Sequence, residues 1–209
     1  MLATKSRTDS IMLDFYESCF DLKIYEVKEK GIEGRDVELL ARQREGVIRK
    51  ALAMDLPKQK NPFLPVWPFS YFSINQQFKL IKDPRGDSKS EIDLNLLQDE
   101  IKAFNVPYFL IGIEEGFDTI GEKFYSSIQN INYHNRTPLT LSEIFSIAIN
   151  TDTFESINLW AVGSKCGPKS YPLLKTNSIG PVISVVASRP TITLKHAGIP
   201  SCVERACFI

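Results

Sequence analysis

The sequence predicts an α+β fold, with N-terminal helices packed on a mainly antiparallel sheet that is formed largely by the C-terminal half of the chain. Apolar residues with helical spacing dominate residues 10–55, whereas β-rich runs separated by glycine and proline dominate the chain beyond residue 157. Of the 209 residues, 43% are hydrophobic and 24% are charged, which is typical of a chain with a sizeable core. Segregated helices and strands favour an α+β fold over a wound parallel sheet, and we expect one domain over residues 1–209.

Two helices are expected near the N-terminus. Residues 10–27 place apolar side chains on one helical face, namely Met12, Phe15, Tyr16, Cys19 and Phe20. After Leu22 the apolar residues alternate, so the sequence does not define where this helix ends. Residues 37–55 predict a second helix, capped by Asp36, with a buried stripe of Val37, Leu40, Ala41, Val47, Ile48, Ala51 and Leu52. Its other side carries the i,i+4 pairs Glu38–Arg42 and Glu45–Arg49, which favour a solvated face over a basic binding surface.

Residues 57–72 combine four prolines with large apolar side chains. Proline cannot donate to a β-ladder, so this segment predicts an edge strand or an extended arm. We expect the apolar side chains to pin the arm to the core, and a surface patch for a partner is the alternative. They are Phe63, Val66, Trp67, Phe69, Tyr71 and Phe72. The polar segment 82–91 is the best candidate for an internal loop or linker, and a helix is expected to begin near Ser90.

In the second half of the chain, a short apolar run between a proline and a glycine at 106–116 predicts a buried strand that ends at Glu114. Thr140 and Glu143 form a capping box in front of a short helix. Glu143 is therefore most simply a cap, and a salt bridge to Arg136 is the alternative. Three β-rich runs follow, at 157–163, 180–188 and 190–196, and predict a sheet that pairs locally.

The charge balance argues against a nucleic-acid partner. The 25 basic and 25 acidic residues give a net charge of zero, whereas proteins that bind nucleic acid usually carry a basic excess. Aromatic and lysine residues do mix at 57–82, which is the pattern of a stacking platform, so this remains a third hypothesis.

The sequence also bears on location. The first 18 residues do not resemble a secretion signal, and no apolar run reaches the roughly 18 residues that a membrane helix needs. We therefore expect a soluble cytoplasmic chain without a membrane partner, with export without a cleaved signal peptide as the alternative. The four cysteines are far apart and are expected to be free thiols.

Several stretches taken in order resemble a family of bacterial proteins that is classed as a domain of unknown function. They are PYFLIGIEEG at 107–116, RTPLTLSE at 136–143, GSKCGPKSYPLL at 163–174, and Arg189-Pro190 leading into TITLKHAGIP. The resemblance covers about half of the chain and implies a soluble bacterial protein with an α+β fold. It implies no activity. Lys165 stands where the family has arginine, and the tail carries Leu194, His196 and Ser201 in place of tryptophans and a histidine.

The loop at 163–169 is the leading candidate for a ligand site. Gly163 and Gly167 allow unusual dihedral angles, Ser164 supplies a hydroxyl and Lys165 supplies a charge. Successive amides in such a turn can bind phosphate or carboxylate, although the spacing is not that of a P-loop. We expect a small anionic ligand to bind there, with Arg136 and Glu114 completing the site. A glycine turn without a ligand is the alternative.

A cysteine-dependent hydrolase or acyltransferase is the competing hypothesis. Cys166 lies beside Lys165, and a neighbouring cation together with backbone amides would lower the pKa of its thiol. Only His134 and His196 could act as its base, with His196 the weak candidate that we retain. The histidines and cysteines lack the spacing of metal-ligand pairs, so we expect no metal and no cofactor. The sequence thus predicts a binding or interaction protein rather than an enzyme.

Overall fold

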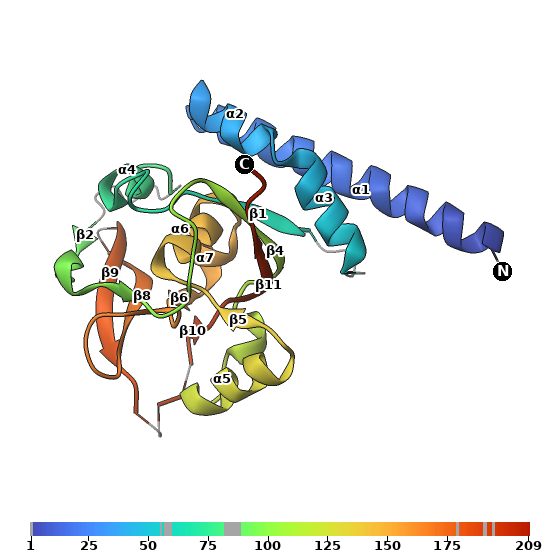
Figure 1. Cartoon of the computed structure of the whole chain (residues 1–209). Helices are drawn as coiled ribbons and strands as arrows, with labels where there is room; N and C mark the ends of the chain where they lie inside the picture. Colours follow the sequence, from blue (N-terminus) through green and yellow to red (C-terminus); the bar gives the residue numbers. More distant parts are fainter. Residues whose placement is uncertain are drawn as a thin grey trace.

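The helices and strands are stacked in alternating layers (Figure 1). The computed structural model describes residues 2–54, 56, 60–81, 89–178, 180–189, 192–193 and 195–209, and for residues 2–9, 89 and 94 it describes the backbone only. From one side to the other, the layers are the N-terminal helices, a four-stranded sheet, a central helix, a five-stranded sheet and a further helix. The predicted α+β fold, with N-terminal helices and mainly antiparallel sheets, is confirmed.

Three helices form the first layer. Helix α1 (Leu2–Glu29) does not end after Leu22, and the inward side chains Tyr16, Phe20, Lys23 and Val27 follow one face of it. The helix predicted at 37–55 is instead two helices, α2 (Arg35–Ala41) and α3 (Arg44–Ala53), and the N-cap of α2 is Gly34 rather than Asp36. At the break between them, the buried Gln43 side chain donates to the carbonyls of Leu39 and Pro107. The Glu38–Arg42 and Glu45–Arg49 pairs are confirmed.

The four-stranded sheet is antiparallel and has the order β1-β4-β11-β5. Its strands are β1 (Phe63–Val66), β4 (Tyr108–Glu114), β5 (Thr137–Pro138) and β11 (Ser201–Ala206). The proline-rich segment supplies β1 as an edge strand, as predicted, and all four of its residues are buried in the core. The buried strand predicted at 106–116 is β4, whose Phe109 packs with the N-terminal helices while Leu110 packs on the central helix.

The central helix α6 (Leu141–Asn150) lies between the two sheets, and all ten of its residues are buried. A helix that is apolar on most sides is typical of a position that is buried between two sheets. The predicted Thr140–Glu143 capping box is confirmed at its start. At its end, the buried Lys23 ammonium of α1 donates to the Asn150 carbonyl at 3.2 Å, which places a cation where the helix dipole is negative. The short helices α4 (Ile74–Phe78) and α7 (Thr153–Ser156) lie beside α6.

The five-stranded sheet has the order β10-β6-β8-β9-β2. Its strands are β2 (Lys89–Ser90), β6 (Asn158–Trp160), β8 (Ser170–Asn177), β9 (Gly180–Ala187) and β10 (Ala197–Gly198). Strands β6 and β9 fall within two of the predicted runs, whereas β8 was not predicted. On the far face of the sheet lies α5 (Phe124–Tyr133), with its Phe124 ring 4.7 Å from that of Trp160.

Two predictions for the middle and the end of the chain need correction. Within the described residues 89–105, no α-helix begins near Ser90. Instead, one 3₁₀ turn (Leu94–Leu96) leads to β3 (Gln98–Asp99), which pairs with β7 (Ser164–Lys165). Of the predicted linker 82–91, residues 82–88 lie outside the described residues. The run 190–196 lies partly outside them, and Thr193 forms only an isolated bridge with Lys123. Among the described residues, no helix has the length and apolar character that crossing a membrane requires.

Candidate functional site

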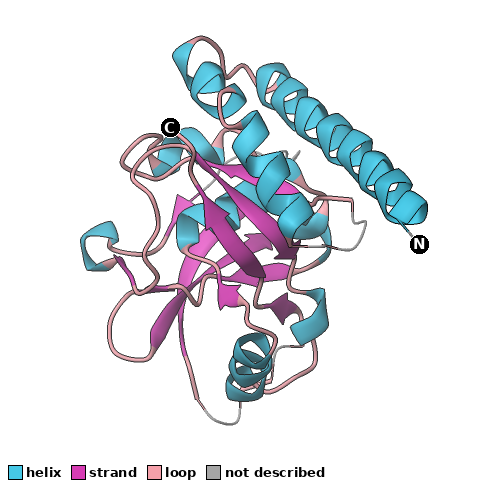
Figure 2. Cartoon of the chain, turned by 45° about the vertical axis from the view of Figure 1, so that its right-hand side comes forward, coloured by secondary structure: helices cyan, strands magenta, loops and turns pink. Residues whose placement is uncertain are grey.

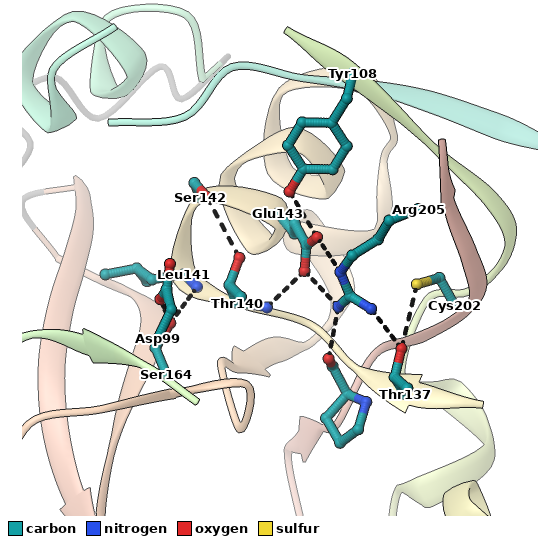
Figure 3. Close-up of polar contacts among 11 residues, drawn as sticks. Asp99, Tyr108, Thr137, Thr140, Leu141, Ser142, Glu143, Ser164, Cys202 and Arg205 are labelled. Atoms are coloured by element: carbon teal, nitrogen blue, oxygen red, sulfur yellow. Dashed lines mark hydrogen bonds and ion pairs between the residues drawn. The ribbon is translucent and has the colours of Figure 1, made fainter. Parts of the chain in front are cut away.

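The glycine and serine at 163–164 pack against the N-terminus of α6. The Gly163 amide donates to the Leu139 carbonyl at 2.8 Å, and a Cβ at position 163 would lie 2.8 Å from the same oxygen, so this position requires glycine. The Ser164 hydroxyl accepts from the Leu141 amide at 2.8 Å and donates to the Asp99 carboxylate (Figure 3). Ser164 is fully buried and therefore satisfies the helix end instead of facing a ligand.

Asp99 brings a negative charge close to this helix end. Burial raises the pKa of the Asp99 carboxyl above its ordinary value, and the hydrogen bond from Ser164 opposes that shift. The charge of Glu143 raises the same pKa further. The carboxylate is thus destabilised by its surroundings, although it lies at the favourable end of the α6 dipole.

Glu143 is the centre of a buried polar network. Both of its carboxylate oxygens bond the Arg205 guanidinium, from Nε at 2.6 Å and from Nη2 at 2.8 Å (Figure 3). The Tyr108 hydroxyl donates to it at 2.6 Å and the Thr140 amide at 2.7 Å. Arg205 also donates to the Thr137 hydroxyl and the Pro138 carbonyl. The cap is therefore as predicted, but the ion-pair partner is Arg205 and not Arg136.

The ionisation of this network is set by burial and by mutual contact. Burial alone would lower the pKa of Arg205, but the hydrogen bonds and charge of Glu143 outweigh it and raise that pKa. Burial, followed by the Glu143 charge, raises the pKa of Tyr108 far above its usual range. The network is thus a fixed ion pair with a neutral phenol, and each of the acidic oxygens is satisfied.

Arg136 holds the end of the four-stranded sheet. Its Nε donates to the Ser201 hydroxyl at 2.9 Å, and its Nη2 donates to the carbonyls of Gly112 at 2.6 Å and Ser201 at 2.9 Å. Gly112 has φ of 64°, and this kink lets Leu110 and Ile113 face the same core despite their odd spacing. Arg136 satisfies the carbonyl at the kink.

Glu114 follows the kink at the end of β4. Its carboxylate accepts from the amides of Gly116 at 2.8 Å and Asp118 at 3.1 Å, so it caps its own turn. Burial raises the pKa of Glu114, and the hydrogen bonds and the charge of Arg136 oppose that shift. Both residues predicted to complete a ligand site thus have internal partners.

Two glycines from distant segments touch through their backbones. A Cβ at Gly198 would lie 2.0 Å from the Gly116 carbonyl oxygen. The next residues of this segment continue the contact, because the Pro200 carbonyl accepts from the Leu139 amide at 3.1 Å. The stretches on which the family resemblance depends therefore meet in one packed framework.

Lys165 and Gly167 lie at the surface beyond this framework. Lys165 pairs with Glu100, which raises the pKa of its ammonium, and its Nζ lies 6.0 Å from the centre of the Tyr171 ring. Lys165 shares no partner with Arg136 among the described residues. The amides of Gly163, Ser164 and Cys166 donate to protein carbonyls, so they do not form an open anion cradle. Anion binding at this loop stays a prediction.

Cys166 is half-buried, and the structure does not give it the features of a nucleophile. Burial raises the pKa of its thiol, whereas the sequence predicted a lowered pKa. His134 and His196 are exposed, and no hydrogen bond in the described part of the chain joins either ring to Cys166. No described group of three or more histidine, cysteine or acidic residues could hold a metal ion.

A cavity of about 340 Å³ separates the end of α1 from the end of α6 and α7. Its lining includes Glu26, Glu29, Lys30, Asn150, Asp152 and Glu155. Several of these groups have protein partners, because Lys30 donates to the Asn150 side chain at 3.2 Å and Asp152 pairs with Lys60 at 3.0 Å. The contact between Lys30 and Asn150 connects the end of α1 to the end of α6.

The outer face of α1 carries a second apolar stripe that sequence reasoning missed. Ile11, Leu22 and Tyr25 are 50%, 54% and 58% exposed, and they lie on the side opposite to the buried face. The half-buried Phe15 and the exposed Ser18 lie between them along the same side. Positions 11, 15, 18, 22 and 25 alternate steps of four and three residues, which is the spacing of a coiled-coil seam. Phe15 also packs partly against the core of the helical layer, and Figure 2 shows α1 along the outer edge of the molecule, with the other described helices and strands on one side of it.

Comparisons with protein-family models, with curated proteins and with solved structures returned no match. The family resemblance drawn from the sequence therefore stays a prediction.

Proposed function

We propose that the chain is a protein-interaction module that binds a partner helix through the outer face of α1. The observation that carries this proposal is the seam formed by Ile11, Phe15, Ser18, Leu22 and Tyr25. Single exposed apolar residues are common on protein surfaces, but a row with seam spacing along one helix is typical of helix pairing.

The position of α1 suits such a role. Its inner face is fixed by Tyr16, Phe20 and Val27, which are buried against the sheet and the other helices. The outer face is therefore presented by a rigid element and not by a loop, which lowers the entropic cost of binding. In Figure 1 the helix lies along the outer edge of the molecule, with α2 and α3 to one side of it.

The other hypotheses have less support. An anion receptor at 163–169 would need open amides and a free Arg136, and these groups have internal partners. A cysteine enzyme would need a thiol of lowered pKa with a base beside it, and burial raises the pKa of Cys166.

Site-specific photo-crosslinking tests the proposal. A photoreactive phenylalanine analogue replaces Tyr25 in the full chain, and the same analogue replaces Tyr133 as a matched control, because Tyr133 is a tyrosine on α5 that is 82% exposed. The cells that produce the chain are irradiated. We expect the analogue at position 25 to give a discrete crosslinked product with a partner polypeptide, and the analogue at position 133 to give none. Absence of an adduct from position 25, or equal adducts from both positions, would contradict the proposed function.

A further inference from the structure

We propose that the partner helix is α1 of a second copy of the chain, bound antiparallel about a two-fold axis near Phe20. This inference rests on the proposed function and names the partner for the same face. It predicts a symmetric dimer in which the same surface of each copy meets the other.

The seam is complementary to itself in this direction. With the axis near residue 20, Phe15 of one copy lies opposite Tyr25 of the other and Ser18 lies opposite Leu22. Ile11 lies opposite Glu29, so the apolar and small pairings form the centre of the seam and the glutamates lie at its two ends. Ring pairs such as Phe15 with Tyr25 contribute beyond the area that they bury.

Charges beside the seam favour the antiparallel over the parallel arrangement. Antiparallel pairing brings Asp14 of each copy next to Lys28 of the other, on the same edge of the seam. Parallel pairing would bring Glu29 against Glu29 and Asp21 next to Glu26, which places like charges together.

The two Asp21 side chains approach each other near the proposed axis, and an internal ion pair reduces their repulsion. Arg44 donates to both oxygens of Asp21, from Nε at 3.0 Å and from Nη2 at 3.2 Å. The same arginine bonds Glu17, so α3 lies on that side of α1 and leaves the seam open.

Sedimentation of the purified full chain tests the dimer. We expect wild type to sediment as a dimer at tens of micromolar, and Leu22→Glu to weaken the association by about a hundredfold, because one substitution counts twice in a symmetric dimer. Glutamate keeps the helix propensity at this exposed position. Tyr133→Glu is the control and is expected to leave the association unchanged. A monomeric wild type, or a dimer that survives Leu22→Glu, would overturn the inference.

Two further measurements test the antiparallel direction. Cys19 lies beside the seam one residue from the proposed axis, so a short bis-maleimide is expected to join the two copies through Cys19 when Cys166 and Cys207 are replaced by serine. Asp14→Lys should weaken the dimer, and adding Lys28→Asp should restore it. A dimer that gives no Cys19 crosslink, or one that the second substitution does not restore, overturns the antiparallel arrangement.

These outcomes separate the inference from the proposed function. If position 25 crosslinks to a different polypeptide while the wild type is monomeric, the interaction function is retained and the second copy is excluded as the partner.

Discussion

Replacing Arg205 by methionine tests the buried network directly. Arg205 is 9% exposed and its partner Glu143 is fully buried, so the substitution removes the counter-ion from a carboxylate that water does not reach. Glu143 keeps the Tyr108 hydroxyl and the Thr140 amide, but it loses both guanidinium donors. The methionine fills much of the volume, so the loss is electrostatic rather than a cavity effect.

The expected loss of unfolding free energy follows from the buried Glu143 carboxylate, which is left without its counter-ion. Removing one partner of a buried ion pair typically costs about 3–5 kcal/mol, and Arg205→Met also takes donors from Thr137 and Pro138, so we expect the upper half of that range. Adding Glu143→Gln removes the stranded charge. The loss of unfolding free energy in the double variant should therefore be smaller than the sum of the two single losses, by about 1 kcal/mol or more.

Urea unfolding measures these losses. The midpoint should fall with the slope unchanged, which separates a loss of stability from a change in the unfolded state. A loss below about 1 kcal/mol for Arg205→Met, or strictly additive losses in the double variant, would refute the reasoning.

Three further predictions concern the other polar and glycine positions. Gly198→Ala should destabilise the chain by about 3 kcal/mol in urea unfolding, because its Cβ would overlap the Gly116 carbonyl, and an effect below about 0.5 kcal/mol would show that the two segments separate freely. The raised pKa of Asp99 means that its contribution to stability is complete below the ordinary value of 3.8 and is lost as pH rises through the folded pKa. Asp99→Asn should therefore gain stability relative to wild type as pH rises above the ordinary value, and a flat or opposite pH dependence contradicts this. Iodoacetamide should alkylate Cys166 more slowly than a free thiol at neutral pH, with a pH profile shifted upward, whereas a profile shifted downward would revive the cysteine hypothesis.

The sequence alone predicts those helices and strands that are determined by residues close together in the chain. The Thr140–Glu143 capping box is four residues long, and both of its members act within one turn of helix. Pro65 cannot donate to a β-ladder, so its segment is expected at the edge of a sheet, where β1 lies. The continuous apolar run of β4 indicates a strand that is buried on both faces. In each case the physical requirement is contained in the segment itself.

The features that the sequence did not predict depend on contacts between residues far apart in the chain. Glu143 and Arg205 are 62 residues apart, and nothing in the strand SCVERA distinguishes a buried arginine from an exposed one. Similarly, Gln43, which lies at the break between α2 and α3, donates to the Pro107 carbonyl, 64 residues further along the chain. Such pairings are defined only when the chain is folded.

The apolar pattern after Leu22 did not define the end of the first helix, for a different reason. Helix α1 has an inner stripe, which includes Tyr16 and Val27, and an outer stripe, which includes Leu22 and Tyr25. Two apolar stripes on opposite sides cancel the one-sided pattern by which an amphipathic helix is recognised. The feature that obscured the helix in the sequence is therefore the same feature that suggests its function.

The thermal unfolding midpoint as a function of chain concentration tests most directly whether the outer face of α1 binds a second copy of the chain. If α1 pairs with a second copy in the native state, mass action should raise the midpoint of the wild type as concentration increases. The midpoint of a Leu22→Glu, Tyr25→Glu variant should not depend on concentration, and at low concentration it should equal that of wild type, since both side chains are more than half exposed. A wild-type midpoint that does not change with concentration, or a variant whose midpoint rises in the same way, would contradict self-association through the outer face of α1.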